Sequence, residues 1–187
     1  MGKFEYLSVL VSIIIGLALA NLLSGAARLI QLRARVQPHV PTLCWMATLF
    51  LINVQVWWAA FDRRHSGDWS FFAFLLFLLI PIILSLLSYL VLPDLGDEDA
   101  VDLAANFNHN RPWFFGLLAA APVISLIDQW LRDGRMPADL DALFRVVFAG
   151  LSLLAARVRS ERFHVANALV ALALFLGYIG VLFLRLR

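Results

Sequence analysis

Residues 69–92 decide the fold, and they read WSFFAFLLFLLIPIILSLLSYLVL. The run contains no charged side chain. A helix rises about 1.5 Å per residue and needs about 20 apolar residues to cross a hydrocarbon layer near 30 Å thick. The run therefore predicts a transmembrane helix.

The composition of the whole chain agrees with this interpretation. Of 187 residues, 62% are hydrophobic and 15% are charged, against roughly 45–50% and 25% in an average soluble domain. The mean hydropathy is +0.84. A soluble domain near 150 residues buries only about 70% of its unfolded surface and must cover the rest with polar groups. A soluble fold is therefore excluded.

Five further runs approach the same length, and charged or helix-breaking residues separate them. Together the six runs predict an all-α, polytopic integral membrane protein: one membrane domain (residues 1–187) that forms a six-transmembrane-helix bundle with short loops. We expect the first run to remain as a helix, because it extends beyond the core of a signal peptide. Residues 97–109 fit either a short interfacial helix or an acidic loop. The predicted spans are residues 6–27, 41–61, 69–92, 112–131, 138–156 and 163–184.

An even number of spans places both termini on one side, called the first side here; the other is the second side. Basic residues divide equally between the two sides, so the positive-inside rule leaves the orientation open. They lie in short groups at the ends of apolar runs, which is typical of membrane flanking and argues against a nucleic-acid partner. We expect a multi-pass protein of a bacterial inner membrane, in contact with lipids.

Charged groups within the spans are the first candidates for function, because each costs at least about 2.5–3.5 kcal/mol at the centre of a bilayer. Asp128 and Arg145 lie equally far from the turn between the fourth and fifth runs, so an antiparallel hairpin brings them to one depth. We expect them to pair, as a structural clamp more readily than as an ion relay. Asn53 and Gln55, two residues apart, leave opposite faces of their helix.

The first run carries a small residue at every fourth position, including Ser12, Gly16, Ala20 and Ser24. Such a stripe favours close helix packing, and Asn21 beside it can donate an interhelical hydrogen bond. Pro81 and Pro122 fall in mid-span, where each removes a backbone bond and kinks the helix.

Polar side chains also gather at the second side, where they could form a polar mouth. None of the histidines has the spacing of a metal-binding helix, so we expect neither a metal nor a cofactor. The only cysteine, Cys44, excludes an intrachain disulfide. The residues of the candidate mouth are His109, Asn110, Arg111, His164 and Asn167.

The chain contains no catalytic or nucleotide-binding motif, so we expect no enzymatic activity. Polar residues at several depths favour a transporter or channel for a small solute or ion. Each of them also has a packing explanation, which leaves a non-catalytic accessory or scaffolding subunit, associated with other membrane proteins or a second copy, as the alternative. An intramembrane lipid-modifying enzyme is a distant third.

Overall fold

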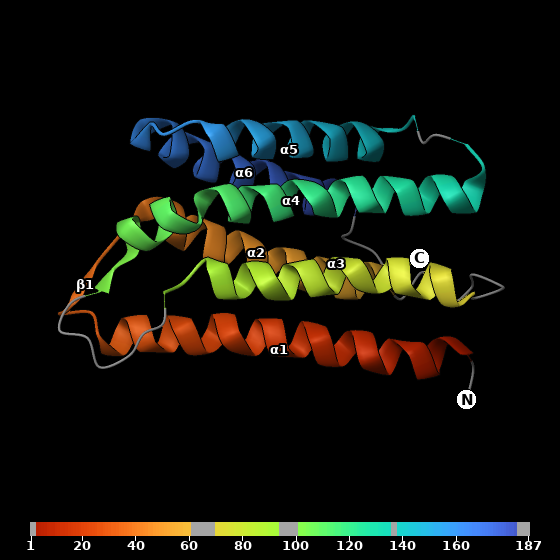
Figure 1. The fold of residues 1–187 in the computed structure, drawn as a ribbon, viewed down its shortest axis with the longest axis horizontal. Helices are drawn as coiled ribbons and strands as arrows, with labels where there is room; N and C mark the ends of the chain where they lie inside the picture. The colour runs from red at the N-terminus through yellow and green to blue at the C-terminus, as the bar shows by residue number, and fades with distance from the viewer. Residues whose placement is uncertain (1–2, 61–69, 94–100, 136–137, 183–187) are drawn as a thin grey trace.

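The computed structural model describes residues 3–60, 70–93, 101–135 and 138–182. In this part of the chain the fold is all-helical apart from two short strands, β1 (Val36–Gln37) and β2 (Val101–Asp102) (Figure 1). The helices are α1 (Lys3–Gln31), α2 (Val40–Ala60), α3 (Phe71–Leu90), α4 (Leu103–Asp133), α5 (Leu140–Arg157) and α6 (Glu161–Leu182).

Five helices, α1 to α4 and α6, are long and apolar enough to cross a membrane. The sixth, α5, has 18 residues and carries Asp141, Arg145 and Arg157. The predicted all-α class with apolar spans is therefore confirmed for five helices.

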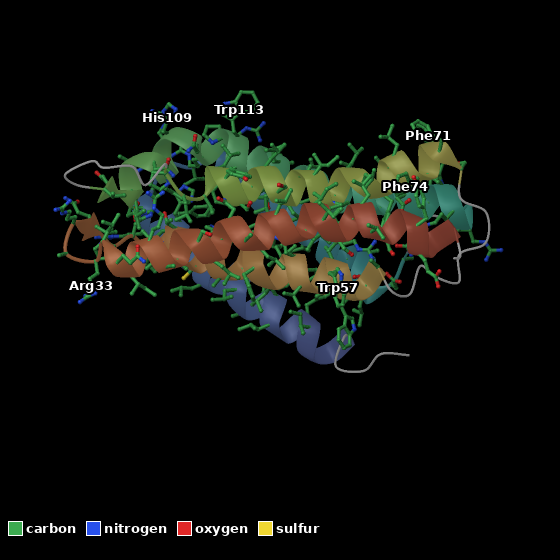
Figure 2. All side chains as sticks on the ribbon, turned by 90° about the horizontal axis from the view of Figure 1, so that it is seen from below. Arg33, Trp57, Phe71, Phe74, His109 and Trp113 are labelled. Atoms are coloured by element: carbon green, nitrogen blue, oxygen red, sulfur yellow. The ribbon has the colours of Figure 1, made fainter. Side chains whose placement is uncertain are left out.

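The helices lie side by side in two layers. α1, α3, α4 and α5 form one layer in that order, and α2 and α6 pack together behind it (Figure 1). α2 also contacts α1, and α6 contacts α5, so the layers enclose a common interior. Seen from below, α6 runs obliquely to the other helices, and its C-terminal end diverges from them (Figure 2).

The two strands link two connections at the second side: β1 lies between α1 and α2, and β2 lies between α3 and α4. β1 pairs in parallel with β2, and the Val101 amide also donates to the Arg35 carbonyl at 3.1 Å. Asp102 then caps α4 by accepting from the amides of Ala104 and Ala105, both at 2.9 Å. A side-chain acceptor satisfies amides that lack partners within the first helical turn.

The separate interfacial helix expected at residues 97–109 is not found. Residues 94–100 lie outside the described part, and residues 103–109 are the first turns of α4, which continues through Pro112 and Pro122 to Asp133. The physical reason is that a proline deprives the helix of one hydrogen bond without preventing the turns on either side from stacking.

An aromatic core fills the second-side half of the bundle. Trp45 lies edge-on to Phe114 and Phe115, with ring centroids 5.6 and 5.4 Å apart. Phe107 contacts Phe115 in the same manner, and the fully buried His164 ring stacks on Phe115 at 5.6 Å. Such tilted and stacked pairs gain energy beyond simple burial. We call these five residues the aromatic core.

The small-residue stripe of α1 does not pack inside the bundle. Ser12, Gly16, Ala20 and Ser24 are all exposed. The buried face of α1 consists instead of Val11, Ile15, Ala18, Leu22 and Gly25. The expected close packing within the chain is thus wrong, because α1 is apolar on several faces and buries the one that carries Val11, Ile15 and Leu22.

Glycine is required at one position on the buried face. A Cβ atom at Gly25 would overlap the side chain of Leu92, whereas a Cβ atom at Gly16 would meet nothing within 4 Å. We expect Gly25→Leu to destabilise the protein in detergent by about 1–3 kcal/mol, since overpacking displaces neighbours. Gly16→Leu is the matched control on the same helix and should change the free energy of unfolding far less. Equal losses would show that Gly25 does not pack against Leu92, two residues beyond the end of α3, as described.

Candidate functional site

A cavity of about 260 Å³ lies between the two helix layers. All six helices contribute to its wall, with α1 contributing Val11 alone. Fifteen of its twenty lining residues are apolar, so the wall is mostly hydrophobic. Both mid-span prolines, Pro81 of α3 and Pro122 of α4, belong to this wall.

The polar side chains of the wall gather toward the first side. The deepest residues, Leu84 and Leu118, are apolar, while Arg132 lies in the last turn of α4 at the first side. Leu118 and Arg132 are separated by about 21 Å along α4. The cavity is therefore amphipathic, with an apolar floor and a polar rim. The rim residues are Gln55, Ser125, Arg132, Arg145 and Tyr178.

A hydrogen-bonded network holds the rim together across three helices. Arg145 of α5 pairs with Asp141 one turn earlier and donates from Nη1 to Gln129 Oε1 of α4 at 2.9 Å. The Tyr178 hydroxyl of α6 donates to Asp141 Oδ1 at 2.6 Å, and its ring stacks on Phe144 at 4.4 Å. Asp141 thus joins a charge on α5 to a hydroxyl on α6.

A second ion pair lies on α4. Asp128, 2% exposed, accepts from Arg132 Nε at 3.3 Å. The partners described for Arg145 are Asp141 and Gln129, and the partner described for Asp128 is Arg132. Asp128 and Arg145 thus each have an ion-pair partner on their own helix. A direct contact between Asp128 and Arg145 stays a prediction.

The polar residues of α1 and α2 have different surroundings. Asn21 donates from Nδ2 to the Ser88 carbonyl of α3 at 2.7 Å, which is the interhelical bond expected of it. Gln55 lines the cavity. Asn53, fully buried, donates to the Leu49 carbonyl at 2.9 Å and is absent from the cavity wall. Only Gln55 of these three belongs to the candidate site.

The structure does not assemble the polar mouth expected at the second side. His109 projects outward from α4 (Figure 2). Asn110 bonds to Asn106 and to the Leu90 carbonyl, and Arg111 and His164 are buried. Asn167 lines a separate space of about 20 Å³ beside Trp45. These side chains therefore do not gather around one opening, because His109 is exposed, Arg111 and His164 are buried, and Asn167 lines a separate space.

Sequence reasoning missed another polar contact at the second side. His39 Nε2 lies 2.8 Å from Glu161 Oε1, and His39 Nδ1 lies 2.8 Å from the Thr42 hydroxyl. The contact joins the start of α2 to the start of α6, and nothing in the local sequence indicates a pair so distant along the chain. Within the described ranges, no three potential metal-ligating side chains come together.

The chain matches no protein-family model, and no curated protein or solved structure is significantly similar to it. The candidate site therefore rests on geometry. The described residues establish a helical bundle with an amphipathic cavity, a charged rim and five helices long and apolar enough to span a membrane.

Removing the shared acceptor of the rim network should be costly. We expect Asp141→Ala to lower the free energy of unfolding by about 1.5–3 kcal/mol and Tyr178→Phe by about 1 kcal/mol. Because both changes remove one hydrogen bond, the double variant should lose less than their sum by at least about 0.5 kcal/mol. Unfolding in detergent measures all three. Asp102→Asn, which keeps a capping side chain at the far end, is the control, and strict additivity would contradict the network.

The direct contact of Asp128 and Arg145 can be tested in the same way. Asp128→Asn and Arg145→Gln should show a coupling energy of about 0.5 kcal/mol or more if the two groups touch or share one water. A coupling near zero would leave two independent ion pairs, each within its own helix.

Proposed function

We propose that the chain is a six-span, multi-pass membrane protein and a non-catalytic carrier of a small solute. The sixth span would be α5, whose 18 residues extend about 27 Å. Its charges are compatible with this assignment, because Asp141, in the first turn of α5, pairs with Arg145 one turn deeper, and the two side chains are only 21% and 22% exposed. Pairing removes most of the cost of placing charge at depth.

The single observation that carries the proposal is the central cavity. Its wall combines residues of every helix, so any small rotation of one helix against another changes the shape of the cavity. Ligand sites in membrane carriers characteristically lie near the middle of the bilayer, between helices that move. A rigid scaffold has no need of such a space.

The two ends of the cavity differ in a way that fits one state of a carrier. Toward the second side, Phe114 and Phe115 lie one turn beyond Leu118 and belong to the aromatic core, which closes that end. Toward the first side the wall carries the polar rim. Transport would require the aromatic core to separate, and Pro81 and Pro122 provide weakened points in α3 and α4 at the level of the cavity.

A carrier is favoured over an ion channel. Ion conduction requires polar groups along the entire path. In the described wall the polar residues are confined to the rim, and the floor around Leu84 and Leu118 is apolar. An apolar or amphipathic solute suits such a wall better than a hydrated ion does.

One observation favours the accessory-subunit alternative. The stripe of α1 formed by Ser12, Gly16, Ala20 and Ser24 is exposed and small, a pattern that allows a helix of another protein to approach closely. The test below separates this candidate from a carrier.

Alternating access can be measured without knowing the substrate. In a Cys44→Ser background, we expect Ala121→Cys, on the cavity wall, to react with the anionic, membrane-impermeant sulfonatoethyl methanethiosulfonate from both sides of proteoliposomes. The guanidinium groups of the rim should attract this reagent. Reaction from the second side should be slower, because the aromatic core is closed in the described state.

Three further cysteines calibrate the measurement. Ala138→Cys and Ala105→Cys, exposed at the first and second side, should each react from one side only, and they report the orientation of the protein. Ala155→Cys, fully buried, should stay unreactive. Reaction of Ala121→Cys from the first side alone would refute the carrier and favour a binding or accessory subunit.

A further inference from the structure

We infer that the cavity binds a single-chain amphiphile with an anionic head group, with the chain on the apolar floor and the head group at Arg132 and Arg145. The inference rests on the proposed carrier function, because it takes this amphiphile to be the substrate of the carrier.

The floor of the cavity calls for a hydrocarbon occupant. Its deep wall consists of side chains such as Ile80, Leu84, Leu118 and Phe175, none of which has a polar group. A buried water needs two to four polar partners, so water is a poor occupant there. The volume of about 260 Å³ lies just below the usual range of small-molecule sites, about 300–1,000 Å³, which leaves room for one chain rather than two.

The arginines of the rim favour an anionic head group. Arg132 and Arg145 line the cavity, whereas their carboxylate partners Asp128 and Asp141 do not. The acids therefore lie outside the lining and hold the guanidinium groups in place, so the charged groups that face the cavity are the two guanidinium groups.

The guanidinium groups have donors to spare. A guanidinium carries five N–H donors in a planar fork that matches a carboxylate or a phosphate. Arg145 donates from Nη1 to Gln129 and from Nη2 to Asp141, and it also bonds to the Tyr178 hydroxyl, while the bond described for Arg132 engages Nε. Gln55 and Ser125 add neutral polar groups on the α2 and α4 walls. A carboxylate or phosphate head group can thus be held by charge-assisted hydrogen bonds.

Other head groups fit less well. A quaternary ammonium would face two guanidinium groups and be repelled. An alcohol would form hydrogen bonds but would not neutralise the guanidinium charge. A fully hydrophilic solute would leave the apolar floor exposed to water. The combination of floor and rim selects an anionic amphiphile.

Binding can be measured with the full chain in phosphatidylcholine nanodiscs. Radiolabelled dodecanoate is the tracer, and dodecanoate, dodecyl phosphate, dodecanol and dodecyltrimethylammonium are the competitors, at a pH where both acids are ionised. Each affinity is corrected for partition into empty discs. We expect at least one anion to bind about tenfold or more tightly than the alcohol and the ammonium compound, and the carboxylate and phosphate arms show which head group is preferred.

Variants assign the binding to the cavity. Arg145→Gln and Arg132→Gln should each weaken binding of the anions about tenfold and leave dodecanol unchanged, because only a charged head group uses the guanidinium. Arg33→Gln, an exposed arginine at the second side, is the matched control and should have no effect (Figure 2). Ala121→Phe fills the cavity and should weaken binding of every compound. If Arg145→Gln does not fold, Arg132→Gln carries the test, because its side chain is 40% exposed.

The outcomes are separable from those of the carrier test. Equal binding of dodecanol and both anions, or equal effects of Arg145→Gln, Arg132→Gln and Arg33→Gln, would overturn the inference. Selective anion binding with one-sided reaction of Ala121→Cys would uphold the inference and refute the carrier. Reaction of Ala121→Cys from both sides without selective anion binding would support the carrier and refute the inference.

Discussion

The pairing of Asp141 with Arg145 is the interaction on which the rest of the structure depends. Asp141 lies in the first turn of α5 and Arg145 lies one turn further along, so each neutralises the charge of the other. Because the residues are one helical turn apart, they lie on one face of α5, and that face can turn inward. Gln129 and Tyr178 then join this face to α4 and α6. The pair thus helps to hold α5 against the cavity, where Phe144, Arg145 and Phe148 form its part of the wall.

The bundle consists of two halves that are packed differently. In the second-side half large rings meet one another, and Trp45 and Phe115 are almost completely buried. In the first-side half the helices present small or ring-constrained residues to the interior, among them Ala59, Ala121 and Pro122. Large side chains fill the space between helices and small ones leave it open. These small residues leave space in the wall of the cavity, which Phe77, Phe148 and Phe175 also line.

The candidate site was predictable only in part. Arg145 and Gln55 were identified because polar residues within apolar runs are conspicuous, and both line the cavity. Arg132 and Tyr178 were missed. Arg132 falls one residue beyond the predicted span 112–131, but α4 extends far enough to bring it to the rim. Tyr178 stands in an apolar run, where nothing nearby marks its hydroxyl as a hydrogen-bond donor.

The sequence by itself determined that the chain is helical and where its apolar runs lie, because helix length and hydropathy are local properties. Only the tertiary structure decided which face of each helix is buried. In a bilayer the lipid-facing and the protein-facing surfaces are both apolar, so hydrophobic periodicity does not distinguish them. For that reason the small-residue stripe of α1 was assigned to the wrong environment, and the partners of Asp128 and Arg145 emerged only from the packing of α4, α5 and α6.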